Sequence, residues 1–236
     1  MIPIGNYPIL WHIMKYYSVW GYEQFVLCLG YKGDRIRDFF RDYRSHTTDC
    51  TIDLSGNTPI QYHNFENLEK WKVTLAETGL NTMTGARIKK IEKHLDDDNS
   101  FMLTYGDGVG TIDVKSLLKF HESHGKILTV TGVRPPGRFG ELQYDEKGQV
   151  TEFNEKPQTS RGRISGGFFV CRKEIFDYID DNEFTVFEQG PMRDLVNAGE
   201  TMIYKHDGFW QPMDTAREYQ YLNELYQKRK ASWVIW

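Results

Sequence analysis

The feature that most constrains the fold is a repeated alternation of short apolar runs with amphipathic helical segments. The run FVLCLG has the pattern of a buried strand, and helical patterns over 9–20 and 33–44 flank it. The same order recurs later, with FMLTYGDG, a helical pattern over 113–124 and the strand-like run KILTVTGV. Strands that alternate with helices indicate a parallel sheet covered by helices. The sequence therefore predicts an α/β fold with a mostly parallel sheet.

From Pro135 onward the helical patterns become sparser. GELQYDEKGQVTEFNEK predicts a hairpin that turns at 146–148, and the apolar strand SGGFFVC follows it. No repeat, low-complexity tract or flexible linker separates the two halves, so we expect one domain over residues 1–236. Further elements are expected as strands at CTIDL, at WKVTLAE near a sheet edge and at TMIYKH, and as helices over 83–95, 173–179, 192–198 and 215–230.

Charge and cysteine content exclude several classes of function. The 29 Lys and Arg residues against 33 Asp and Glu give a net charge of -4, which argues against a nucleic-acid partner. The 3 cysteines are far apart and odd in number, so we expect neither a disulfide framework nor a cysteine metal site, but a reducing, cytoplasmic compartment. No apolar run approaches the roughly 20 residues that span a bilayer, so we expect no membrane segment.

The tetrapeptide YGDG is the first candidate for chemistry, because ligands of parallel α/β sheets bind at the carboxyl ends of strands. Gly106 and Gly108 would let a ligand approach the backbone closely, and Asp107 would supply the hard oxygen ligand that Mg²⁺ prefers. An Asp-Gly pair is also an ordinary turn signal. The tetrapeptide alone leaves both interpretations open.

A second acid, Asp214 in WQPMDT, is the candidate partner of Asp107. A magnesium ion that is shared with phosphates usually takes only one or two protein carboxylates, so one distant partner is sufficient. Asp214 could instead be the N-cap of the helix that follows it.

Two further segments carry charge or free amide groups at positions that suit an anion. Lys156 in EKP follows a predicted strand and could bind a phosphate monoester, although most lysines are solvated surface residues. In TMTGARIKK, Thr82, the backbone of Gly85 and Arg87 stand at a helix start, where free N–H groups and the helix dipole favour an anion.

Taken in order, these segments resemble one known family. PILWHIMKYYSVWGYEQFVLCLGYKGDRIRDFF, TGLNTMTGARIKKI, FMLTYGDGV, PPGRFGEL, FNEKP, SGGFFV and GFWQPMDT are similar to the sugar-phosphate nucleotidyltransferases, and within them to the glucose-1-phosphate cytidylyltransferase branch. The resemblance implies a Rossmann-like nucleotidyltransferase core with a smaller β-rich sugar-binding portion. It also implies the conversion of CTP and glucose 1-phosphate to CDP-glucose and pyrophosphate, and homo-oligomers that serve nucleotide-sugar synthesis for lipopolysaccharide O-antigen.

The resemblance also assigns roles to individual residues. It implies that Asp107 and Asp214 hold magnesium and that these two and Lys156 are catalytic, with Lys156 on the sugar phosphate. The nucleotide is then expected beside Thr82, Gly85, Arg87 and Gly106, and the glucose pocket at Gly140, Glu155 and Gly167.

One departure from the family pattern stands at the start of the chain. Family members begin with a buried strand, a GGxGTR loop that cradles the triphosphate and a PKP segment, and here Met1 coincides with the residue after that PKP. We expect either an incomplete sequence of a true enzyme, or a shortened protein that binds sugar phosphate or oligomerises without catalysis. A missing central strand would leave unpaired backbone groups at a sheet edge. We expect weak or no activity from this chain by itself.

A different reaction or a different base is also compatible with parts of the sequence. A metal-dependent glycosyltransferase would show a DxD cluster, but Val109 occupies the second position after Asp107. A lectin-like module would explain the 14% aromatic content but not two distant acids and a lysine. UTP or dTTP could replace CTP as the nucleotide. The aromatic start YPILWHIM and tail ASWVIW are expected as subunit contacts.

Overall fold

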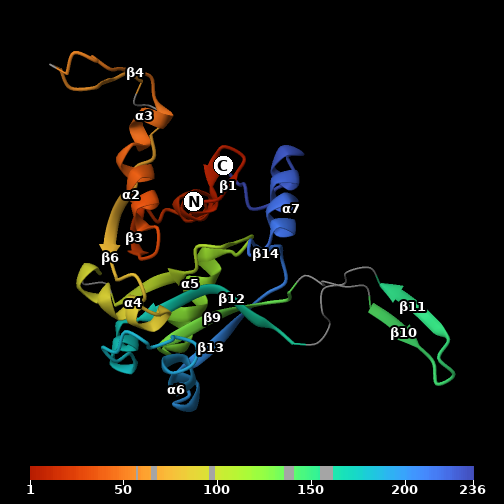
Figure 1. Ribbon diagram of the computed structural model, residues 1–236. Helices are drawn as coiled ribbons and strands as arrows, with labels where there is room; N and C mark the ends of the chain where they lie inside the picture. Colours follow the sequence, from red (N-terminus) through yellow and green to blue (C-terminus); the bar gives the residue numbers. More distant parts are fainter. Residues whose placement is uncertain (57, 65–67, 96–98, 136–140, 155–161) are drawn as a thin grey trace.

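The computed structural model describes residues 1–56, 58–64, 68–95, 99–135, 141–154 and 162–236. Helices and strands build a mixed α/β body from which one hairpin projects (Figure 1). Within the described residues, no helix is long and apolar enough to cross a membrane.

The largest sheet has four strands in the order β13-β9-β12-β7. They are β7 (Ser100–Thr104), β9 (Leu128–Val133), β12 (Ile164–Arg172) and β13 (Thr201–His206). β13 pairs in parallel with β9, whereas β12 is antiparallel to both β9 and β7. Three strands therefore run in one direction, as predicted, and their carboxyl ends lie at one edge of the sheet.

A second sheet pairs β3 (Gln24–Leu29) in parallel with β6 (Lys72–Glu77). β6 is an edge strand, as WKVTLAE predicted. Among the described residues, β3 pairs only with β6 and β7 only with β12. Each of these two sheets therefore has an open strand edge among the described residues.

The segment CTIDL does not join either sheet. Only Cys50–Thr51 forms a strand, β4, which pairs antiparallel with β5 (Gln61–Tyr62) in a separate ladder. Leu54 is 94% exposed, so the apolar residues of this segment are not used in a core. The prediction of a strand within the alternating pattern was wrong here. The preceding helical pattern also splits, into α2 (Gly33–Arg41) and α3 (Tyr43–Thr47).

The remaining helices follow the predicted order. They are α1 (Ile9–Val19), α4 (Thr84–Lys90), α5 (Val114–His124), α6 (Pro191–Asn197) and α7 (Ala216–Gln227), with 3-10 turns η1 (Glu92–His94) and η2 (Lys173–Tyr178). Asp113 caps α5 by accepting a hydrogen bond from the N–H of Ser116. The projecting hairpin joins β10 (Glu141–Tyr144) to β11 (Val150–Asn154), and Gly148, with φ 81°, forms its turn as predicted.

Two apolar clusters fill the two faces of the larger sheet. Phe168 belongs to the first cluster, with α1, Leu222 of α7 and Trp233. Phe169 belongs to the second, with Ile88 of α4. Neighbouring residues of a strand point to opposite faces, so this consecutive pair anchors both clusters.

The aromatic start and tail of the chain pack against each other. The start forms a small ladder of β1 (Pro3–Ile4) with β2 (Tyr7–Pro8). Trp233 is 1% exposed and stacks on Phe209, and Trp236 contacts Trp11 with ring centroids 5.8 Å apart. The two ends also lie close together in Figure 1. Packing within the chain thus uses part of these aromatic residues, and their assignment to subunit contacts stays a prediction. The homo-oligomer stays a prediction.

Candidate functional site

Two short strands that the sequence did not predict bring the acid pair together. β8 (Gly108–Gly110) pairs antiparallel with β14 (Trp210–Pro212), with Gly108 opposite Pro212. The ladder continues by one bond, because the N–H of Met213 donates to the carbonyl oxygen of Asp107 at 2.8 Å. Asp107 and Asp214 therefore emerge at the same end of this ladder, directly beyond β7.

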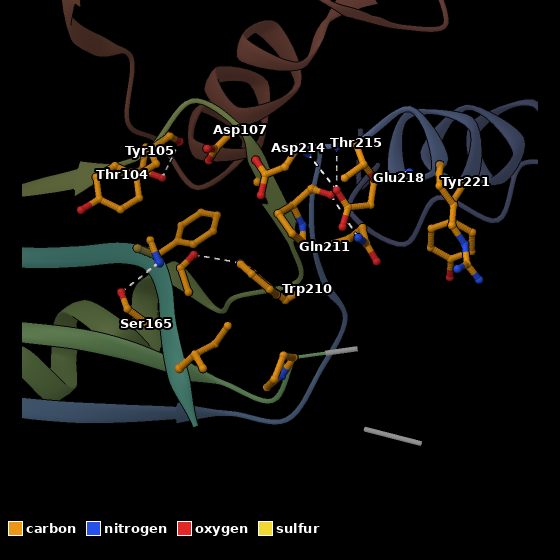
Figure 2. Close-up of a pocket in the computed structure, with 18 residues that line it drawn as sticks. Thr104, Tyr105, Asp107, Ser165, Trp210, Gln211, Asp214, Thr215, Glu218 and Tyr221 are labelled. Carbon is orange, nitrogen blue, oxygen red and sulfur yellow. Dashed lines mark hydrogen bonds between the residues drawn. The ribbon is translucent and has the colours of Figure 1, made fainter. Parts of the chain in front are cut away.

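Both carboxylates face a cavity of about 830 Å³ (Figure 2). Three structures build its walls: the end of β7, the first part of β12, and the segment from β14 into α7. Besides the two acids, the lining includes Tyr105, Gly166, Gly167, Trp210, Arg217 and Glu218.

The electrostatics of the acid pair favour a cation. Asp107 is exposed to the cavity, yet desolvation of its carboxyl raises its pKa above the ordinary value, and the negative charge of Asp214 is the second cause. Two carboxylates at one place repel each other unless a cation or a proton lies between them. The pair is thus suited to a divalent ion.

Asp214 is not the N-cap of α7. Thr215 is the cap: its hydroxyl accepts from the N–H of Glu218 at 3.3 Å, and Glu218 accepts in return from the N–H of Thr215 at 2.9 Å. The N–H of Asp214 is bound by the same Glu218 carboxylate at 2.9 Å. The capping role considered for Asp214 is therefore filled by its neighbour, and the Asp214 carboxylate takes no part in the cap.

The donor set fits magnesium better than a tightly caged metal. No group of three or more His, Cys, Asp or Glu residues able to hold a metal occurs among the residues that the structure describes. Mg²⁺ commonly binds through one or two carboxylates, keeps several waters and shares substrate phosphates. Asp107 and Asp214 supply two such carboxylates.

The opposite wall of the cavity is a glycine bulge in β12. Ser165 pairs with Gly132 and Phe169 with Val130, so β12 has two extra residues between these pairs. Gly167 has φ 74°, and a Cβ there would lie 2.9 Å from the ring of Tyr105, so a larger residue would be strained and crowded. Gly167, which the resemblance placed in the glucose pocket, does line the cavity.

The indole of Trp210 joins this bulge to the acid strands. Its N–H donates to the carbonyl oxygen of Gly166 at 2.8 Å (Figure 2). The N–H of Tyr105 donates to the carbonyl of Gly167 at 3.1 Å. Trp210 also belongs to the β14 ladder that holds Asp214 next to Asp107. The bulge and the acid pair are thus fixed relative to each other.

The helix start at 82–87 does not have the free amide groups that were predicted. The N–H groups of Gly85 and Ala86 both donate to the carbonyl of Thr185, at 2.9 and 3.2 Å. An anion would have to displace that carbonyl, so the predicted anion site made of free N–H groups is wrong. Neither Thr82, Gly85 nor Arg87 lines the cavity.

Thr82 and Arg87 instead lie at the carboxyl ends of β3 and β6. Arg87 donates to the carbonyl of Leu29 at 3.0 Å and to the hydroxyl of Thr78 at 2.6 Å. The hydroxyl of Thr82 accepts from Lys90 at 3.3 Å. The Arg87 guanidinium is thus held by uncharged oxygens, which leaves its positive charge uncompensated by these partners.

The predicted residues divide into three groups. Asp107, Asp214 and Gly167 meet at the cavity, and Gly106 adjoins Asp107 with open space where a Cβ would point. Thr82, Gly85 and Arg87 form a separate group. Gly140, Glu155 and Lys156 lie outside the described residues.

Sequence reasoning missed several residues that line the cavity. Tyr105 and Trp210 belong to segments that were singled out only for their acids. Arg217 and Tyr221 follow Asp214 at helical spacings of three and seven, which places them on one face of α7. That periodicity is present in the sequence and could have identified them.

Similarity to known proteins identifies the family of this chain. The model of the nucleotidyl transferase family matches residues 1–229. The chain belongs to this family. A glucose-1-phosphate cytidylyltransferase of Salmonella typhi is 46% identical over 236 residues, which cover 100% of this chain and 90% of the relative. A probable glucose-1-phosphate cytidylyltransferase of Bacillus subtilis is 38% identical and covers 99% of this chain and 89% of the relative.

A solved structure shares the overall fold of this chain. HddC from Yersinia pseudotuberculosis superposes with a TM-score of 0.63 at 22% identity, over 96% of this chain and 88% of that one. The parallel and mixed sheets of the present chain agree with the α/β architecture that the sequence predicted.

Proposed function

We propose that this nucleotidyltransferase converts CTP and glucose 1-phosphate to CDP-glucose and pyrophosphate. The observation that carries the proposal is the meeting of Asp107 and Asp214 at one cavity, opposite a glycine bulge. The names of the relatives from Salmonella typhi and Bacillus subtilis, which match nearly the whole chain, support the choice of substrates.

In this proposal Asp107 and Asp214 hold a magnesium ion. When bound, the ion would offset negative charge on the phosphates as a bond to the α-phosphorus forms and breaks. The raised pKa of Asp107, caused by desolvation and then by the negative charge of Asp214, supports a cation at this place.

The residues of the chain otherwise act by positioning. The glycine bulge presents main-chain groups to the sugar, because Gly166 and Gly167 line the cavity and have no side chains. A phosphate oxygen of the sugar phosphate attacks the α-phosphorus in line, and pyrophosphate leaves on the opposite side. Holding two reactants in this geometry provides much of the catalysis of such reactions. Lys156 is proposed to hold the sugar phosphate.

The proposal is tested by pyrophosphate release from glucose 1-phosphate and magnesium with CTP, UTP or dTTP, and by mass analysis of the product. Weak CTP-dependent release with formation of CDP-glucose is the expected result. Faster pyrophosphate release with UTP or dTTP than with CTP would show that the enzyme uses that nucleotide instead. Calorimetric binding of glucose 1-phosphate without turnover on any nucleotide would favour a non-catalytic protein that binds sugar phosphate or oligomerises.

A further inference from the structure

The cavity contains one positive charge that the proposed function does not use. Arg217 is the only Lys or Arg side chain that lines it within the described part of the chain. We infer that Arg217 binds a phosphate group of the substrates beside the acid pair. This inference rests on the proposed nucleotidyl transfer and names a further binding residue for it.

The position of Arg217 follows from the first turns of α7. Asp214 immediately precedes the helix and Thr215 caps it, and Arg217 and Tyr221 follow at spacings that share one helical face. Both line the same cavity as Asp214. The side chains of Thr215 and Glu218 bind the main-chain N–H groups at the start of this helix, and these hydrogen bonds fix the first turn that carries Arg217 next to Asp214.

Arg217 is also free of the contacts that occupy other arginines. Arg37 pairs with Glu77 at 3.2 Å, and Arg163 pairs with Asp207 at 2.7 Å. For Arg217 the structure gives no hydrogen bond or ion pair with any described residue, including Asp214, which stands just before the helix. The nearby carboxylate of Glu218 is bound to the helix start instead.

Charge in the cavity explains why a phosphate would need this residue. Asp107, Asp214 and Glu218 bring three carboxylates to the described lining, and Arg217 is their single counter-charge. A divalent ion would neutralise the two carboxylates that Arg217 does not offset, but an incoming phosphate adds further negative charge. A guanidinium can then donate two parallel hydrogen bonds to phosphate oxygens, which an ammonium cannot reproduce.

The phosphate could belong to the sugar 1-phosphate or to the nucleotide, since both carry the same recognisable group. Calorimetric titrations with magnesium present separate these sources: glucose 1-phosphate in one arm, CTP in a second, and cytidine, which has no phosphate, as the neutral probe. Arg217→Gln is expected to weaken binding of one phosphate ligand about ten-fold or more, the size of a hydrogen bond to a charged group, and to leave cytidine binding unchanged.

Matched variants define the role further. Arg217→Lys should recover only part of the affinity, because it keeps the charge but loses the paired donors. Arg193→Gln removes an exposed arginine from α6, distant from α7 in Figure 1, and should change nothing. Thermal unfolding of Arg217→Gln should match the parent, because the residue is exposed and has no described partner.

The outcomes separate this inference from the proposed function. If the parent protein forms CDP-glucose and Arg217→Gln binds both phosphate ligands like the parent, the inference is wrong and the proposed function stands. Equal weakening of cytidine binding would also overturn it, because it would indicate a general distortion of the site. If the parent binds neither phosphate ligand and releases no pyrophosphate, the proposed function itself fails.

Discussion

The indole N–H of Trp210 donates to the carbonyl oxygen of Gly166 at 2.8 Å and thereby joins the strand next to the acids to the glycine bulge of β12. Trp210→Phe keeps an aromatic ring and removes this bond. A hydrogen bond of this kind contributes about 1 kcal/mol, so we expect roughly five-fold weaker binding of glucose 1-phosphate. Titration calorimetry with glucose 1-phosphate and with CTP measures both affinities.

Trp71→Phe is the matched control for that variant. The indole N–H of Trp71 is buried and has no hydrogen-bond partner among the described residues, and the ring packs against Trp11 and Phe25. This control should leave both affinities unchanged. A Trp210→Phe protein with parental affinity for glucose 1-phosphate would show that the bond does not position the bulge.

Replacing Asp107 by Asn should remove magnesium binding and most turnover without loss of the fold. The folded-state pKa of Asp107 is raised, so the carboxyl destabilises the fold as pH rises through that value. At neutral pH without metal, Asp107→Asn should therefore unfold at the same or a higher temperature than the parent. Magnesium should raise the unfolding temperature of the parent but not of the variant.

The control for the metal experiment is Asp181→Asn, at an exposed position outside the cavity lining. It should respond to magnesium like the parent. Near-normal pyrophosphate release by Asp107→Asn would contradict the assignment of the metal site.

Unfolding experiments can distinguish the proposed role of Asp214 in metal binding from the role of Thr215 in capping α7. Thr215→Ala removes the side-chain cap of α7 and should cost about 1 kcal/mol in the free energy of unfolding. Asp214→Ala should leave the stability of the metal-free protein nearly unchanged while abolishing the response to magnesium. Denaturant titrations with and without magnesium measure the free energy of unfolding of each variant and its response to the ion. The reverse pattern would make Asp214 the capping residue.

A chain of hydrogen bonds through His124, Thr129 and His121 predicts how the free energy of unfolding depends on pH. The N–H of Lys126 donates to Nδ1 of His124 at 2.9 Å, so Nε2 of His124 carries the proton and donates to the Thr129 hydroxyl at 2.8 Å. That hydroxyl then donates to Nδ1 of His121 at 2.8 Å. Burial, followed by the charges of His124 and Arg172, lowers the pKa of His121 to about 4.

The folded-state pKa of His121 lies below its ordinary value of 6.5. The stability that the fold gains from a neutral His121 is therefore complete above pH 6.5 and is lost as pH falls toward 4. The loss should be on the order of 2–3 kcal/mol. Unfolding free energies at pH 7 and pH 4.5 should differ less in His121→Gln than in the parent. His46→Gln, at an exposed position, should keep the parental difference. An equal pH dependence of the unfolding free energy in all three proteins would refute this role of His121.

Long periodic segments allowed most of the fold to be predicted. FVLCLG, KILTVTGV, SGGFFVC and TMIYKH all became strands, because each carries a run of apolar or β-branched residues. β8 and β14 were missed, since GVG and WQP are three residues long and contain glycine or proline, which strand patterns exclude. These short strands are stabilised by long-range pairing, and local sequence carries no signal for that.

The site was predictable to the extent that strand ends determine it. Asp107 follows a strand, and this placement singled it out as a candidate that the family resemblance then assigned to magnesium. That Asp214 would be free of capping depended on Thr215 and Glu218 forming the capping box, a choice between neighbouring residues that the sequence left open. The anion site at Gly85 failed because Thr185, distant in sequence, fills the helix start.

The pairing of β8 with β14 also sets a time order for biosynthesis. Asp107 is translated first, and the strand β14 and Asp214 follow only after a long intervening stretch of the chain. During synthesis the ribosome must therefore add residues 108–214 before the two carboxylates can meet. Metal capture by the pair is thus restricted to molecules whose translation has passed Asp214, and a product that ends before Trp210 would carry Asp107 without its partner.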